Sequence, residues 1–221
     1  MATLYITSPE TFSGKSAMCV GLGKRFIRDG YRVGYMKPVS TNAKRSGGVC
    51  VDEDAEFIKQ TFNLKEPVSM LAPICLDASD LEAVLRGEKN DFVRTLQDVF
   101  ARVADEKDIM ILEGGSSLSE GSMMNLPTYE VSRLLDAREL VVVKYNPTST
   151  VDDLLGSKAL LGDSMIGAVI NAVPRPKMEF VQDVVVPFLG TRGVKVLAVL
   201  PQERVLLSIS VRELAQVLGG D

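Results

Sequence analysis

The chain of 221 residues contains no histidine, no tryptophan and three cysteines. Without histidine, a Ser-His-Asp or Cys-His catalytic apparatus and a histidine-ligated metal are impossible. Cys19, Cys50 and Cys75 are far apart, odd in number and not part of a C-x-x-C pair, so they predict no zinc site and are expected to be reduced thiols. Chemistry must therefore come from lysine, acidic groups, hydroxyls, backbone amides or a bound ion.

An excess of positive charge is also missing, because the formal net charge is -4 and no block of Lys or Arg stands out. Nucleic acid is therefore not an expected partner. No apolar run approaches the ~20 residues of a membrane span, and the N-terminus lacks a basic start. These features predict a cytoplasmic protein that does not associate with membranes. Its length and 46% hydrophobic content predict one domain over residues 1–221.

Short apolar runs rich in β-branched residues alternate with longer amphipathic segments, which indicates a mostly parallel, doubly wound sheet in a three-layer α/β/α arrangement. Six strands are expected, over 3–7, 31–36, 108–112, 139–144, 165–170 and 194–200. Helices are expected over 15–28, from near 52 onwards, and over 90–104, 127–135, 151–161, 177–189 and 210–218. The stretch 41–51, rich in Gly, Ser and Lys, is expected to be a mobile surface loop.

Gly14-Lys15-Ser16 follows the first expected strand and opens the first expected helix. Together with Thr11-Phe12-Ser13 it predicts a P-loop, in which backbone N–H groups and the helix dipole surround phosphate. Lys15 would reach the β- and γ-phosphates, and the Ser16 hydroxyl would bind Mg²⁺. A strand-to-helix turn capped by Ser16 is the alternative, because Pro9 stands where the P-loop consensus has glycine.

Three charged residues elsewhere in the chain are further candidates for the site. Glu113 ends an apolar strand, where a carboxylate can hold Mg²⁺ or simply be a solvated turn residue. Asp54 lies in the first turn of a helix, where it could bind Mg²⁺ or only complement the helix dipole. Lys37 leaves the second strand just before Pro38, which stiffens the backbone that carries it, and most lysines so placed are only solvated.

These residues resemble those of one known family. Ser8 to Ser16 is similar to the one-residue-longer P-loop of dethiobiotin synthetases. Further matches follow in the same order along the chain: Lys37-Pro38-Val39, Asp54-Ala55, Glu113-Gly114-Gly115 and Asn171. The likeness is greatest to the branch that forms the amino-terminal module of proteins with a DRTGG domain and is related to the amino-terminal part of long phosphotransacetylases.

The resemblance implies a P-loop NTPase fold that binds ATP and Mg²⁺, with further site residues. Lys37 would bind a carbamate substrate and help to neutralise phosphate charge as a second cation, and the Thr41 hydroxyl could add a contact. Asp54 would be a Mg²⁺ ligand. Asn171 would contact adenine, although a turn asparagine before proline explains it almost as well, and Pro201-Gln202 would belong to the base-side loop. A homodimer is also implied, because synthetases complete their substrate site across a two-fold interface.

Three functions remain open at this point. The first is an ATP-dependent cyclo-ligase that phosphorylates a carbamate or carboxylate so that an amine can close on it. The second is a nucleotide-sensing regulatory module without ligase turnover. The third is a structural module with a decayed P-loop. The segment 114–121 reads Gly-Gly-Ser-Ser-Leu-Ser-Glu-Gly and departs from the synthetase pattern, which makes the diamine pocket the weak point of the first reading.

Overall fold

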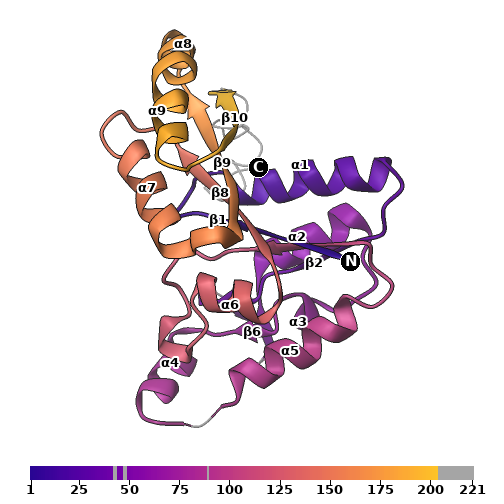
Figure 1. Cartoon of the computed structure of the whole chain (residues 1–221). Coiled ribbons are helices and arrows are strands. Elements are labelled where there is room, and N and C mark those ends of the chain that lie inside the picture. Colours follow the sequence, from indigo (N-terminus) through magenta and orange to yellow (C-terminus); the bar gives the residue numbers. More distant parts are fainter. Residues whose placement is uncertain (42–43, 47–48, 89, 204–221) are drawn as a thin grey trace, which may run out of the picture.

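A computed structural model describes residues 1–41, 44–46, 49–88 and 90–203, without the side chains of 44–46 and 49–50. At its centre is a six-stranded sheet with the order β10-β9-β8-β1-β7-β2 (Figure 1). All five strand pairs of this sheet are parallel. The strands are β1 (Ala2–Thr7), β2 (Val33–Met36), β7 (Ile109–Glu113), β8 (Arg138–Lys144), β9 (Met165–Val173) and β10 (Val196–Pro201). The six expected strands and the doubly wound sheet are therefore confirmed.

Helices cover both faces of the sheet. On one face lie α1 and α2, while α5, α6, α7 and α9 follow one another along the other (Figure 1). Their bounds are α1 (Lys15–Arg28), α2 (Glu53–Phe62), α5 (Phe92–Val103), α6 (Thr128–Leu134), α7 (Thr150–Leu161) and α9 (Val186–Thr191). Two further helices, α3 (Val68–Leu71) and α4 (Ala78–Leu85), were not expected from the sequence.

The helix expected over 177–189 is interrupted. The chain forms a 3₁₀ turn at Arg175–Lys177, one turn of α8 (Met178–Phe180), a π turn at Val181–Val185 and then α9. Pro187 lies in the first turn of α9. Because proline has no N–H to donate to a preceding carbonyl, regular α-helical bonding cannot run unbroken through this position.

The expectation of a loop over 41–51 is wrong in part. Short strands β4 (Lys44–Ser46) and β5 (Val49–Val51) pair there in antiparallel fashion. Beside them, β3 (Val39–Ser40) pairs in parallel with β6 (Ile74–Cys75). Cys75 is disulfide-bonded, which contradicts the expected reduced thiol, whereas Cys19 is free and buried. The helix expected over 210–218 lies outside the described residues.

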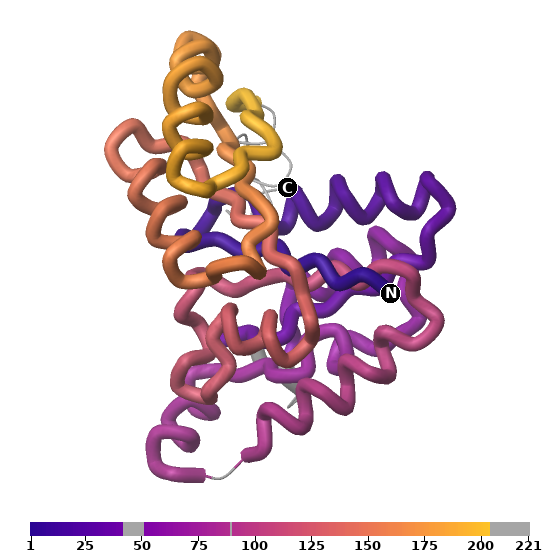
Figure 2. The backbone as a smooth tube through the Cα atoms, viewed as in Figure 1, coloured from indigo at the N-terminus to yellow at the C-terminus, as the bar shows by residue number. Residues whose placement is uncertain are grey.

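The position of β1 in the sheet decides where a site can form. β1 lies between β7 and β8, which follow it late in the sequence, as the indigo start of the chain shows in Figure 2. Ile6 is in register with Glu113 and also with Leu140. Connections leave β1 toward one edge of the sheet and leave β7 toward the other, so the carboxyl end of β1 opens at a topological switch point, where doubly wound sheets bind ligands.

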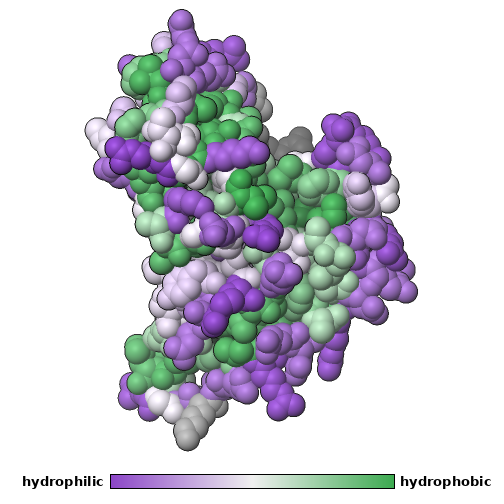
Figure 3. All heavy atoms as spheres, viewed as in Figure 1, coloured by the Kyte–Doolittle hydropathy of each residue, from purple (hydrophilic) through white to green (hydrophobic). Residues whose placement is uncertain are grey.

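The surface carries some large apolar side chains among the polar ones, as one face shows in Figure 3. The exposed examples include Leu85 on α4 and the row Phe180, Val184 and Phe188 along the segment from α8 to α9. Scattered apolar side chains of this kind are normal on folded proteins and do not by themselves mark a site.

Candidate functional site

The loop from β1 to α1 has the backbone conformation of an anion-binding turn. Phe12 and Gly14 both have left-handed φ values, 54° and 100°. Alternation of right- and left-handed residues turns successive N–H groups toward one side, which forms a concave nest for an anion. Within it, the buried Ser13 hydroxyl has no hydrogen-bond partner among the described residues. An unpartnered buried donor in such a turn is a free energy cost that a bound phosphate oxygen would offset.

Gly14 is required by close packing as well as by its φ value. A Cβ atom at Gly14 would lie 2.4 Å from Nδ2 of Asn171. That same Nδ2 donates a hydrogen bond to the Ser13 carbonyl at 2.9 Å. Asn171 on β9 therefore supports the backbone of the loop from behind, a contact that the sequence did not suggest.

Lys15 opens α1 and is buried. Its Nζ donates to the Glu10 carbonyl at 3.3 Å, so the ammonium folds back over the loop. Burial lowers the pKa of Lys15, and the nearby Glu113 carboxylate acts against that shift. Because this hydrogen bond to a neutral carbonyl is long, the buried ammonium is well placed to donate to phosphate oxygens as well.

Ser16 and Glu113 meet at the floor of the site, although they are far apart in sequence. Ser16 Oγ donates to Glu113 Oε1 at 2.6 Å, and the Tyr35 hydroxyl donates to Oε2 at 2.7 Å. Glu113 is only 2% exposed, and burial raises its pKa. The alternative of a solvated turn residue is therefore wrong for Glu113. Tyr35 was missed because a tyrosine inside a strand normally indicates core packing.

Lys37 emerges from β2 between two carboxylates. Its Nζ lies 2.9 Å from Asp52 Oδ2 and 2.7 Å from Asp54 Oδ2. Burial alone would lower the pKa of Lys37, but the charge of Asp52 and the hydrogen bonds to both carboxylates outweigh it and raise the pKa. Lys37 is therefore not a freely solvated lysine.

Asp52 fixes this arrangement from inside the protein. It is buried, and it accepts hydrogen bonds from Ser40 Oγ at 2.6 Å and from the Ala55 amide at 2.8 Å. The second bond caps α2. Asp54 is about half exposed, at 48% of its side chain. Asp52 is therefore both the N-cap of α2 and the buried partner of Lys37, and sequence reasoning missed the second role.

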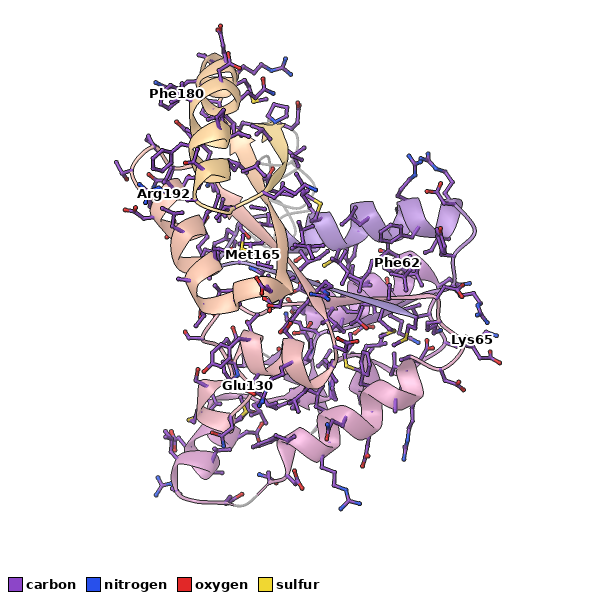
Figure 4. The ribbon with its side chains drawn as sticks, viewed as in Figure 1. Phe62, Lys65, Glu130, Met165, Phe180 and Arg192 are labelled. Atoms are coloured by element: carbon purple, nitrogen blue, oxygen red, sulfur yellow. The ribbon has the colours of Figure 1, made fainter. Side chains whose placement is uncertain are left out.

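Lys15, Lys37 and Glu113 line one cavity of about 590 Å³. Figure 4 shows the side chains of the surrounding elements. The lining residues are Thr11, Phe12, Ser13, Gly14, Lys15, Ser16, Ala17, Lys37, Ser40, Asp54, Glu113, Gly114, Gly115, Ser116 and Glu120. The cavity thus brings together the expected phosphate loop, both expected lysines and all three expected metal ligands.

Four of the expected site residues are not among those lining residues. Thr41 lies beside the cavity, and its hydroxyl donates to Glu120. Asn171 contacts the phosphate loop from behind, as described above. Pro201 ends β10, and the Gln202 amide donates to the Val173 carbonyl at 2.8 Å. The base-contacting roles expected for Asn171, Pro201 and Gln202 therefore stay predictions.

The cavity contains oxygen donors of the kind that Mg²⁺ prefers. No group of three or more His, Cys, Asp or Glu side chains that could hold a metal occurs in the part of the chain that is described. Mg²⁺ in nucleotide sites is held largely by phosphate oxygens and water, together with one or two carboxylates of the protein. The hydroxyl of Ser16 and the carboxylates of Glu113 and Asp54 face the same cavity and are oxygen donors of that kind. The residues present fit the ion.

Comparison with known sequences gives a consistent result. A family model described as an AAA domain matches residues 2–209. The chain is similar to the ATP-dependent dethiobiotin synthetase of Methanococcus vannielii, with 25% identity over 178 residues, 77% of this chain and 79% of that protein. It is also similar to the ATP-dependent dethiobiotin synthetase of Caldicellulosiruptor saccharolyticus, with 28% identity over 121 residues, 54% of this chain and 50% of that protein. The chain spans about half the length of the first curated relatives it matches.

Solved structures support the fold. The MinD cell division protein of Aquifex aeolicus superposes with a TM-score of 0.59 at 14% identity, covering 96% of this chain and 87% of that one. At such low identity the likeness shows the three-layer fold alone. Among the described residues, none of the helices combines the length and the apolar character needed to span a membrane.

Proposed function

The chain belongs to the family described as an AAA domain, and on this premise we propose that it binds Mg·ATP in the cavity and transfers the γ-phosphoryl group to a carbamate or carboxylate. The observation that carries the proposal is the convergence of Lys15, Ser16 and Glu113 beneath a loop with an anion-binding backbone. The printed names of the relatives, ATP-dependent dethiobiotin synthetases, support the same reaction class.

In this proposal each residue has a defined task. The amides of Ser13 to Ser16 and the Lys15 ammonium hold the phosphates, and Lys37 neutralises charge on the side where the acceptor lies. Ser16, Asp54 and Glu113 would hold Mg²⁺, which would neutralise phosphate charge when it is bound. An acceptor oxygen forms a bond to the γ-phosphorus while the bond to the β–γ bridging oxygen breaks and ADP leaves. An amine of the substrate then displaces the phosphate and closes the ring.

A second candidate is a nucleotide-binding regulatory module without ligase turnover. It is favoured by the segment that follows β7, in which Glu120 accepts hydrogen bonds from Ser116 and from Thr41. That segment does not follow the synthetase pattern. The substrate side of the cavity could therefore have changed while the phosphate side was kept.

Turnover separates the two candidates. The purified chain is incubated with ATP, Mg²⁺, bicarbonate and diaminononanoate, and the formation of ADP and of the cyclic product is measured, with Lys15→Ala as the control. The ligase predicts both products from the wild type and neither from the variant. Saturable ATP binding without products would contradict the ligase and support the regulatory module. The absence of ATP binding would contradict both candidate functions.

A further inference from the structure

Glu120 joins two loops that border the cavity. Its Oε1 accepts hydrogen bonds from the amide of Thr41 at 3.2 Å and from the hydroxyl of Thr41 at 2.8 Å. Its Oε2 accepts hydrogen bonds from the Ser116 amide and, at 2.6 Å, from the Ser116 hydroxyl. One side chain therefore connects the end of β3 to the turn that follows β7.

The carboxylate is charged and fully engaged in these contacts. Burial alone would raise the pKa of Glu120, but the hydrogen bonds from Ser116 and Thr41 outweigh it and lower the pKa. A carboxylate offers about four acceptor positions, and four donors reach this one. Glu120 is thus arranged to hold backbone in place, not to offer a free charge to a ligand.

Gly115 shows how closely the contact is fitted. A Cβ atom at Gly115 would lie 2.2 Å from Glu120 Oε2 and 2.3 Å from Cδ. Any side chain at this position would displace the carboxylate from Ser116. Gly115, Ser116 and Glu120 all line the cavity, so a displacement would reach the cavity wall.

We propose that Glu120 is a positioning residue that fixes Thr41 and the Gly115-Ser116 turn. It thereby fixes the wall of the cavity that Gly115, Ser116 and Glu120 form. In the proposed function the phosphoryl acceptor binds against this wall. The inference rests on the proposed function for that assignment alone, because the contacts themselves exist without any nucleotide.

Hydrogen exchange at two amides tests the role in the nucleotide-free protein. In Glu120→Ala the amides of Thr41 and Ser116 lose their acceptor, and exchange at both is expected to become about tenfold faster or more. Glu120→Gln keeps one carbonyl oxygen and presents an NH₂ group to the other pair of donors. It is therefore expected to protect one of the two amides and to release the other, a signature that a general loss of stability would not produce.

A double-mutant cycle gives a second test. Gly115→Ala alone is expected to speed exchange at Ser116 to a similar degree, because its Cβ displaces the Glu120 carboxylate. In the Glu120→Ala background the same substitution is expected to add little, because the atoms it would meet are gone. Gly156→Ala on α7 is the matched control, since nothing lies within 4 Å of a Cβ there.

Mg·ATP titration completes the experiment. Glu120→Ala is expected to weaken Mg·ATP binding much less than Lys15→Ala does, because the hydrogen bonds of Glu120 go to Thr41 and Ser116 and not to the phosphate loop. Unchanged exchange at both amides, or full additivity of the Gly115 and Glu120 substitutions, would overturn the proposal. A loss of Mg·ATP affinity as large as that of Lys15→Ala would also overturn it, because Glu120 would then belong to the nucleotide contacts. Failure of the wild type to bind Mg·ATP would contradict the proposed function and leave the exchange result standing.

Discussion

Lys15 and Lys37 carry the same charge on the same cavity but have different surroundings. The ammonium of Lys37 is already compensated by Asp52 and Asp54, whereas that of Lys15 meets the neutral Glu10 carbonyl. Lys15→Ala is therefore expected to weaken Mg·ATP binding by about 3 kcal/mol, or roughly a hundredfold, because a charge-assisted hydrogen bond is lost. Lys37→Ala is expected to cost much less. Competition with a fluorescent ATP analogue measures both, and equal losses would contradict the assignment of Lys15 to the phosphates.

Glu113 is placed where function and stability oppose each other. Burial raises its pKa, so the fold disfavours the ionised form, and this cost is felt above the raised pKa and disappears as the pH falls through it. Glu113→Gln is expected to unfold at a higher temperature than the wild type at pH 7 without nucleotide. The difference should close as the pH falls toward the ordinary value of 4.5. Addition of Mg·ATP should raise the unfolding temperature of the variant less, because a metal-binding oxygen is lost. A variant that is less stable than the wild type at pH 7 would contradict this prediction, because the ionised carboxylate would then stabilise the fold on balance.

Asp108 holds together the strands that deliver Lys37 and Glu113. It accepts hydrogen bonds from the backbone and the guanidinium of Arg32, and these lower its pKa to about 2 from 3.8. Because the folded-state pKa is the lower one, the stabilisation is present above 3.8 and is lost as the pH falls through about 2. Asp108→Asn is expected to be slightly less stable than the wild type at pH 7, since the pair is exposed. Urea unfolding should show that difference narrowing below pH 3.8, and a constant difference would contradict the role of the charge.

Part of this site could be predicted residue by residue. Gly14, Lys15 and Ser16 have a fixed local spacing, and Glu113 ends an apolar strand, so both signals lie within short stretches of sequence. Tyr35 and Glu120 gave no such signal, because their importance comes from hydrogen bonds to residues far along the chain. Long-range polar contacts of this kind depend on strand register and loop conformation, which residue patterns do not specify.

At the scale of elements, alanine substitutions at two glycines of α1 are expected to change the stability of the protein in opposite directions. A Cβ at Gly23 would lie 2.1 Å from Phe62 Cζ on α2, which points toward α1 in Figure 4, whereas nothing lies within 4 Å of a Cβ at Gly21. Gly21→Ala should stabilise the protein by about 0.5–1 kcal/mol through helix propensity. Gly23→Ala should destabilise it by about 1–2 kcal/mol, because crowding exceeds that gain.

Thermal unfolding of the pair checks this packing. With a shift of about 2–4 °C per kcal/mol in a chain of this size, Gly21→Ala should rise and Gly23→Ala should fall by a measurable amount. Shifts of the same sign in both variants would mean that α1 and α2 do not pack as closely as the structure has them.

The elements were predictable where they repeat a regular pattern. The six strands are short apolar runs, and α1 has both of its ends marked, by Gly14 at the start and Gly30 after the end. The segment 41–51 was not, because its paired strands β4 and β5 are three residues each and have no apolar alternation to mark them. The break between α8 and α9 depends on how a proline is accommodated, which periodicity does not report.

At the scale of the whole molecule, the strand order explains why distant residues meet. Parallel strands present their carboxyl ends at one edge, so the residues that end β1, β2 and β7 must approach one another once β1 lies beside β7 and β7 beside β2. The resemblance to dethiobiotin synthetases implied a P-loop NTPase fold, but no strand order was predicted, because alternation of strands and helices alone allows several orders. What the sequence could not supply is the substrate side of the cavity, where it departs from that family.

Calorimetric titration of the wild-type chain with Mg·ATP tests the central claim most directly, namely that the turn from β1 into α1 holds phosphate. Saturable binding of one nucleotide per chain, accompanied by a rise in the unfolding temperature, is the predicted result. Absence of both heat and stabilisation at millimolar Mg·ATP would contradict the account.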